Sequence, residues 1–228
     1  MNFSIKISPI VIKILAGILV VLVIAVCAKK INDVIIINKT KDGFETVKNA
    51  YAEAVKKENF VWKKGVMKTS LFGTKIAKYL PVKQNCEYDP NHICYPQYIN
   101  FKNIVDGSDK VHVFDFYKIT LKNDMVLLFK VVSPDCSYLR DRCATVFVDI
   151  NGKKGPNKFG EDIYDFLIQK DQVTLYPKEA DHEERCLKGS GLGCADFMFT
   201  YGNRNFDKYE KYQKNEIKKE LKKLNEKR

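Results

Sequence analysis

The residues best suited to bind an ion lie close together near the middle of the chain. Asp149, Asn151 and Gly152 form an Asp-x-Asn-Gly sequence, and Asp162 follows shortly after it. Carboxylate and amide oxygens are the ligands that calcium prefers in proteins. The spacing therefore makes calcium binding the first chemistry to test.

The register of a helix–loop–helix calcium site does not fit this stretch. With Gly152 at the sixth loop position, the first ligand would be Phe147 and the twelfth Lys158, and neither carries a carboxylate. A plain turn held by side-chain-to-backbone hydrogen bonds is our prediction, with no metal bound. A non-standard oxygen site made of Asp149, Asn151 and Asp162 is its alternative.

The same stretch also ends a strand. Thr145–Ile150 is a β-branched and aromatic run, which predicts a buried or half-buried strand. Glycine and asparagine tolerate positive φ, and proline presets φ for a turn, so the residues that follow predict two successive turns. We call this segment the signature turn; it comprises Asp149, Asn151, Gly152, Gly155, Pro156 and Asn157.

Six of the seven cysteines fall into local pairs. The pairs are Cys86 with Cys94, Cys136 with Cys143, and Cys186 with Cys194. Each brackets a loop rich in turn residues, and no Cys-x-x-Cys spacing suggests zinc, so we predict disulfides. Six cysteines allow about 15 connectivities, and a mixture of free and bonded cysteines stays open. Disulfides would place the domain in an oxidising compartment, outside the cytoplasm.

The sequence offers little support for catalysis. Its histidines are His92, His112 and His182, and none belongs to a metal-protease motif. No nucleophile elbow or phosphate-binding loop occurs, and the glycine-rich residues 189–193 read as a disulfide-closed turn. We therefore predict a protein that is not an enzyme and has no cofactor.

The chain begins with a membrane-type segment. Ile10–Ala28 is apolar apart from Lys13, and extended back to Ile7 it is long enough to span a bilayer. We predict a single uncleaved span with the amino terminus in the cytoplasm. A cleaved secretory signal and a lipoprotein signal ending at Cys27 are the alternatives.

The net charge of +11 is carried mainly by lysine. Solvated lysine faces explain it, and attraction to anionic lipid, nucleic acid or polyanionic glycans is the alternative. Because no basic run is interleaved with aromatic residues in a known motif, we expect no nucleic acid partner.

The remaining patterns predict an α+β fold. An amphipathic helix over Lys41–Glu58, either separate from the membrane helix or continuous with it, packs on a small antiparallel sheet with disulfide-closed loops. Val61–Tyr79 predicts a short helix with loops, Phe114–Val132 a hairpin, and Val173–Tyr176 a short strand. Asn205–Arg228 predicts a charged helix. The domains are residues 1–30 (membrane anchor or signal), 31–202 (extracytoplasmic domain) and 203–228 (charged tail).

This order of parts resembles the type IV pilins and type II secretion pseudopilins of bacteria. The resemblance lies in Val148–Asp162 with Ile163–Phe166 after it, in Phe44–Trp62, and in the late Cys186 and Cys194-Ala195. The chain departs from that family at its start, which reads Met-Asn-Phe-Ser-Ile-Lys in place of the peptidase motif Gly-Phe-Thr-Leu-x-Glu.

The resemblance implies a non-catalytic, membrane-anchored subunit of a pilus or secretion apparatus. It would be single-pass in the cytoplasmic membrane, with the carboxyl-terminal domain outside the cytoplasm and other pilin-like subunits as partners. The alternative is a free-standing, surface-exposed module that binds a polyanion, a glycan or a metal ion.

Overall fold

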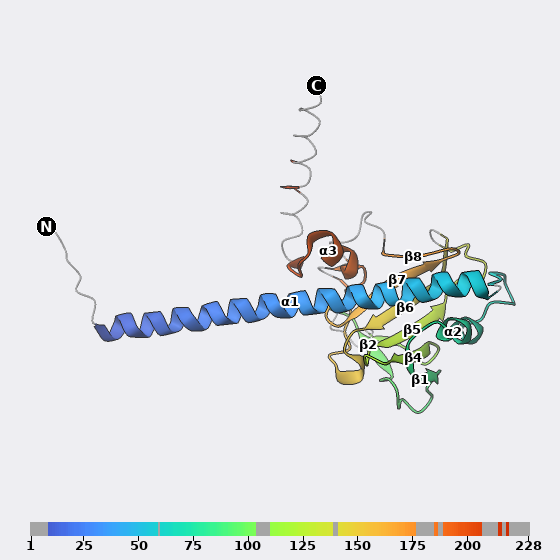
Figure 1. The fold of residues 1–228 in the computed structure, drawn as a ribbon, viewed down its shortest axis with the longest axis horizontal. Helices are drawn as coiled ribbons and strands as arrows, with labels where there is room; N and C mark the ends of the chain where they lie inside the picture. Colours follow the sequence, from blue (N-terminus) through green and yellow to red (C-terminus); the bar gives the residue numbers. More distant parts are fainter. Residues whose placement is uncertain are drawn as a thin grey trace, which may run out of the picture.

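A long helix and an antiparallel sheet make up most of the molecule (Figure 1). The computed structural model describes residues 9–58, 60–103, 110–138, 141–176, 185–186, 189–206, 214–215 and 218. The expected membrane segment and amphipathic helix form one element, α1, which runs from Pro9 to Lys57 over 49 residues. The α+β prediction with a long amino-terminal apolar helix is confirmed.

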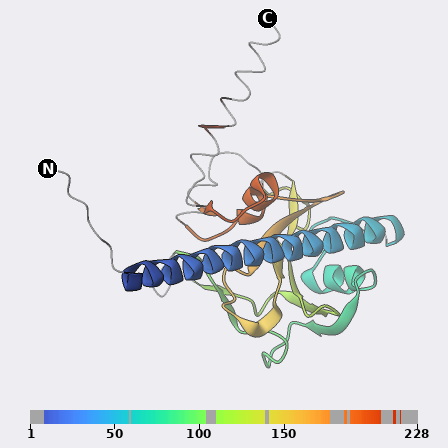
Figure 2. The ribbon, with the colours of Figure 1, turned by 60° about the vertical axis from the view of Figure 1, so that its left-hand side comes forward.

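The two halves of α1 have different surroundings. Side chains from Lys13 to Asn32 are exposed, and this half projects beyond the domain in Figure 1. In Figure 2, where that side is turned forward, the helix passes in front of the sheet. In the second half, Val47, Tyr51 and Ala54 are fully buried at helical spacing. Gly43 belongs to the buried face because a Cβ there would lie 2.6 Å from Cγ1 of Val148.

The main sheet has six strands in the order β1-β4-β5-β6-β7-β8, and every neighbouring pair is antiparallel. Its strands are β1 (Val82–Glu87), β4 (Tyr117–Leu121), β5 (Val126–Val131), β6 (Arg142–Asp149), β7 (Ile163–Gln169) and β8 (Val173–Thr174). A second sheet pairs β2 (Tyr98–Asn100) with β3 (Lys110–His112).

Both faces of the main sheet are covered. The second half of α1, together with α2 (Thr69–Ala77) and α3 (Cys194–Tyr201), packs on one face. The second sheet and the residues around Phe159 pack on the other. Because both faces are covered, the central strands are buried along most of their length instead of alternating between buried and exposed residues.

Several predicted elements are confirmed. The hairpin over 114–132 is β4 and β5, the strand over 145–150 is β6, and the short strand at 173–176 is β8. The short helix within 61–79 is α2. The sequence interpretation did not include β1, β2, β3, β7 or α3, and most of the helix expected over 205–228 lies outside the described residues.

Candidate functional site

The signature turn starts from a buried carboxylate at the end of β6. Asp149 is fully buried, and its Oδ2 accepts the hydroxyl hydrogen of Tyr95 across 2.7 Å. Its Oδ1 accepts the backbone N–H of Asn151 at 3.1 Å. With its amide nitrogen turned inward, Asn157 donates to Oδ2 of Asp149 at 3.0 Å and to the carbonyl of Gly152 at 3.2 Å.

A second carboxylate closes the same segment. Oδ1 of Asp162 accepts the N–H of Lys158 at 2.7 Å, and its Oδ2 accepts the N–H of Asn157 at 2.9 Å. Nδ2 of Asn151 also donates to Oδ2 of Asp162 at 3.2 Å and to the carbonyl of Gly155 at 3.1 Å. The two aspartates therefore hold the segment from both ends. Within it lie the short 3₁₀ helix η1 (Gly152–Lys154) and the cis Gly155–Pro156 peptide bond.

Burial dominates the electrostatics of this carboxylate pair. It raises the pKa of Asp149 to about 7, opposed by the hydrogen bond from Tyr95 and assisted by the nearby charge of Asp162. The pKa of Asp162 is also raised by burial, against the stabilising N–H donors of Lys158 and Asn157. Each carboxylate is thus harder to ionise than a solvated one.

The structure brings together the residues of the possible calcium site, but their hydrogen bonds are those of a turn. Asn151 presents its Nδ2 to Asp162 and leaves its buried Oδ1 without a partner in the described part of the chain. The carboxylate oxygens of Asp149 and Asp162 accept N–H and O–H donors. Metal ligation by these oxygens would require that network to rearrange. Across the described residues, no group of three or more His, Cys, Asp or Glu is arranged to hold a metal.

The predicted cysteine pairs form three disulfides, Cys86–Cys94, Cys136–Cys143 and Cys186–Cys194. Among the described cysteines, Cys27 is free and exposed on α1.

The first disulfide loop positions Tyr95. Inside the loop, Oδ2 of Asp89 accepts the N–H groups of Cys94 and Tyr95, both at 2.9 Å. Lys118 of β4 is buried against this loop, and its Nζ donates to the carbonyl of Tyr88 at 2.7 Å. Burial lowers the pKa of Lys118, while the charge of Asp89 opposes the shift. The loop thereby presents the Tyr95 hydroxyl to Asp149.

Asp165, which the sequence interpretation did not single out, is a further buried carboxylate. Its Oδ1 accepts the N–H of Gly193, the N-cap of α3, at 2.8 Å, and its Oδ2 has no hydrogen-bond partner among the described residues. Burial raises its pKa to about 6, opposed by the Gly193 hydrogen bond and the nearby charges of Arg142 and Arg185. The only sequence signal is an aspartate inside the apolar run Ile-Tyr-Asp-Phe-Leu-Ile.

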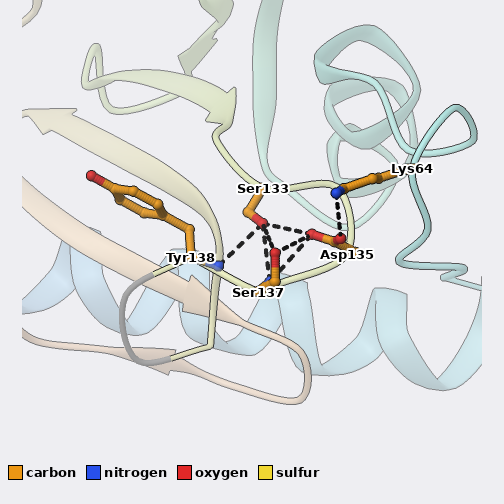
Figure 3. A network of polar contacts seen from close by, with 5 residues as sticks. All are labelled: Lys64, Ser133, Asp135, Ser137 and Tyr138. Atoms are coloured by element: carbon orange, nitrogen blue, oxygen red, sulfur yellow. Dashed lines mark hydrogen bonds and ion pairs between the residues drawn. The ribbon is translucent and has the colours of Figure 1, made fainter.

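The loop closed by Cys136–Cys143 carries a separate polar network (Figure 3). Oγ of Ser133 donates to Asp135 at 2.8 Å and accepts the N–H of Ser137 at 3.0 Å, while Lys64 lies 3.5 Å from the other oxygen of Asp135. The hydrogen bonds from Ser137 and Ser133 lower the pKa of Asp135. This arrangement stabilises the loop.

Two of the three histidines belong to the described part of the chain. His92 and His112 are exposed. His112 lies between the rings of Tyr98 and Phe114, with each centroid 6.5 Å away. His182 lies outside the described residues. The glycine-rich segment 189–193 is a loop closed by Cys186–Cys194, as predicted.

The exposed first half of α1 is a candidate membrane-spanning segment. Among the described residues, α1 is the one helix long and apolar enough to cross a membrane. Its large exposed side chains include Ile14, Leu19 and Leu22. No protein-family model, curated protein or solved structure matches this chain.

Proposed function

We propose that the chain is a non-catalytic, membrane-anchored subunit of the pilin and pseudopilin kind, acting as a structural or interaction component of a pilus or secretion apparatus. The observation that carries this proposal is the division of α1. One continuous helix has an apolar half that no described part of the domain covers and a second half packed on the sheet.

The hydrophobic effect explains why the first half requires an environment other than water. Burying one Val, Leu or Ile side chain is worth about 1.5–3 kcal/mol, and this half exposes a long row of them. About 20 helical residues extend roughly 30 Å, which matches the hydrocarbon core of a bilayer. A lipid bilayer is therefore the cover that fits both its length and its composition.

The domain has features that suit a rigid element outside the cytoplasm. Its three disulfides favour an oxidising compartment. The signature turn is fixed by Asp149 and Asp162, so the loops at that end of the sheet keep one shape. In this proposal α1 and the rigid loops supply the contacts to other subunits.

The test is membrane extraction followed by co-purification. The full chain should remain in carbonate-washed membranes, and after mild solubilisation it should retain other subunits that carry an amino-terminal apolar helix. The variant Val20→Arg/Ile24→Arg should lose both properties, while its purified chain still forms the three disulfides in an oxidising buffer. The control Lys63→Gln/Lys170→Gln, on exposed lysines of the domain, should keep both. A chain released by carbonate, or one that purifies alone from intact membranes, would contradict the proposal.

One observation favours a second candidate, a surface-exposed binding module. Tyr98, His112 and Phe114 form an exposed row of rings along the second sheet, and Nζ of Lys110 lies 4.2 Å from the centroid of Tyr98. Exposed aromatic patches mark interaction surfaces. A chain that stays monomeric and binds an acidic glycan, with loss of binding in Phe114→Ala, would favour this alternative.

A further inference from the structure

Three turns meet at one end of the main sheet. The N–H of Lys122 donates to the carbonyl of Pro81 at 2.9 Å, which joins the start of β1 to the β4–β5 turn. Nζ of Lys83 lies 2.6 Å from Oδ1 of Asp124 across the same junction. The backbone of Gly152 in η1 packs against this turn so closely that a Cβ would lie 2.6 Å from the carbonyl oxygen of Asp124.

This turn cluster is strongly basic. Its exposed lysines are Lys83, Lys122, Lys153 and Lys154. Asp124 is the carboxylate within the cluster, and its pKa is lowered by the hydrogen bond and charge of Lys83 and also by the charge of Lys154. The described cluster thus holds four exposed ammonium groups and one exposed carboxylate, so this end of the sheet carries a net positive charge.

The cluster lies at the end of the sheet that faces the apolar half of α1. Gly43, near the middle of α1, contacts Val148 close to the end of β6. Further along α1, the hydroxyl of Tyr51 donates to the carbonyl of Gln169, which pairs with Arg142 at the start of β6. β6 therefore runs antiparallel to α1, and η1 after it extends back toward the apolar half.

Element geometry places the cluster near the expected bilayer surface. Gly43 follows Ala28 by fifteen residues, which is roughly 22 Å of helix at 1.5 Å per residue. From Val148 the chain runs back toward the membrane, and Gly152 follows four residues later. These residues cover at most roughly 13 Å at the strand rise of 3.3 Å per residue. The remaining distance is at least about 10 Å, which is on the order of the Debye length at physiological ionic strength, so lysines there would interact with the charge of the headgroups.

Contacts near both ends of the packed half of α1 hold the domain on the helix. They fix which side of the domain faces the apolar half, and the turn cluster lies on that side. Arg204 lies 3.5 Å from Asp33, shortly after the apolar half, and both side chains are largely buried. Tyr51 holds the opposite end.

Beside the cluster, Ile93 leaves 63% of its surface exposed, and its carbonyl accepts a hydrogen bond from Nζ of Lys153 at 2.8 Å. An exposed isoleucine next to lysines is the combination found on surfaces that meet the membrane interface.

We propose that this turn cluster docks on anionic phospholipid headgroups, so that the domain rests against the bilayer in which α1 is anchored. The inference depends on the proposed function for the membrane anchor. A soluble polyanion is the other partner that suits a basic surface. The membrane-facing position of the cluster favours lipid.

The experiment uses the full chain in nanodiscs made either of phosphatidylcholine alone or of equal parts phosphatidylcholine and phosphatidylglycerol. Hydrogen exchange should slow several-fold at the β4–β5 turn and η1 in the anionic discs only, and high salt should reverse the effect. The variant Lys122→Gln/Lys153→Gln/Lys154→Gln should lose this slowing. The control Lys56→Gln/Lys63→Gln/Lys170→Gln, on exposed lysines elsewhere in the domain, should keep it.

Equal exchange in both kinds of disc would overturn lipid docking, as would slowing that persists in the triple cluster variant. Slowing by heparin but not by the anionic discs would assign the cluster to a soluble polyanion instead. Failure of the wild-type chain to enter nanodiscs at all would overturn the membrane anchor, and therefore the proposed function itself. The two failures are distinguishable because insertion is measured by co-elution with the disc before any exchange is recorded.

Discussion

The hydroxyl of Tyr95 donates to Oδ2 of Asp149 across 2.7 Å, although the two residues are 54 positions apart in the chain. This bond joins the Cys86–Cys94 loop to the end of β6. The buried carboxylate in turn accepts the N–H of Asn151 and orders the start of the signature turn. A disulfide loop and a turn on different strands therefore share one buried polar network.

Removing the Tyr95 hydroxyl should weaken this network measurably. At a pH above about 7, where Asp149 is ionised, Tyr95→Phe leaves its buried carboxylate with one donor fewer, and a hydrogen bond to a charged group is worth about 1.5–3 kcal/mol. We expect the free energy of unfolding, measured by chemical denaturation, to fall by about that amount. The control is Tyr98→Phe, since Tyr98 is partly exposed on the second sheet. Equal stability of the two variants would contradict the role assigned to Tyr95.

Asp165 should make stability depend on pH in a defined direction. Its pKa is about 6 in the folded protein against 3.8 for a solvated aspartate, so folding takes up a proton between these values. Its contribution to the free energy of unfolding is fully present below about pH 4 and is lost as the pH rises through about 6.

Asp165→Asn keeps an oxygen that can accept the N–H of Gly193 and removes the titration. The difference in unfolding free energy between wild type and variant should therefore change by about 2–3 kcal/mol between pH 4 and 7. Urea denaturation at a series of pH values measures it. A constant difference across that range would show that Asp165 is ionised throughout.

Gly43→Ala tests how closely α1 approaches the sheet. Alanine favours helix by about 1 kcal/mol over glycine in a helix interior. At Gly43, however, the new Cβ would lie 2.6 Å from Cγ1 of Val148, and overpacking of this kind costs about 1–3 kcal/mol. We expect a net loss of thermal stability. Gly17→Ala has nothing within 4 Å of its Cβ and should leave the unfolding of the domain unchanged.

Local signals in the sequence were sufficient for part of the fold. The hairpin of β4 and β5 shows strand patterning on both sides of a polar turn, and Asp124 in that turn has a positive φ. The disulfide pairs are close in sequence and bracket turn residues. The end of β6 was recognisable because Asn151 and Gly152 follow it directly.

Other parts depend on contacts between distant residues. β7 follows the signature turn and is buried on both faces, so it has no alternation to distinguish it from other apolar runs. The role of Asp165 depends on Gly193, which is distant in sequence. Tyr95 lies in a loop with no strand or helix pattern, and only the folded sheet brings it to Asp149. Periodicity and turn chemistry carry no information about such pairs.

The Cys86–Cys94 disulfide should act on Asp149 through Tyr95. In the double variant Cys86→Ser/Cys94→Ser, the loop loses its covalent closure, and we expect the unfolding free energy to fall by about 2–3 kcal/mol. Because the loop then holds Tyr95 less firmly, adding Tyr95→Phe should cost less than it does in the wild type. The double-mutant cycle measures this coupling, with Cys27→Ser as the thiol control on the exposed half of α1. Strictly additive effects would mean that Asp89 and Lys118 position the loop without the disulfide.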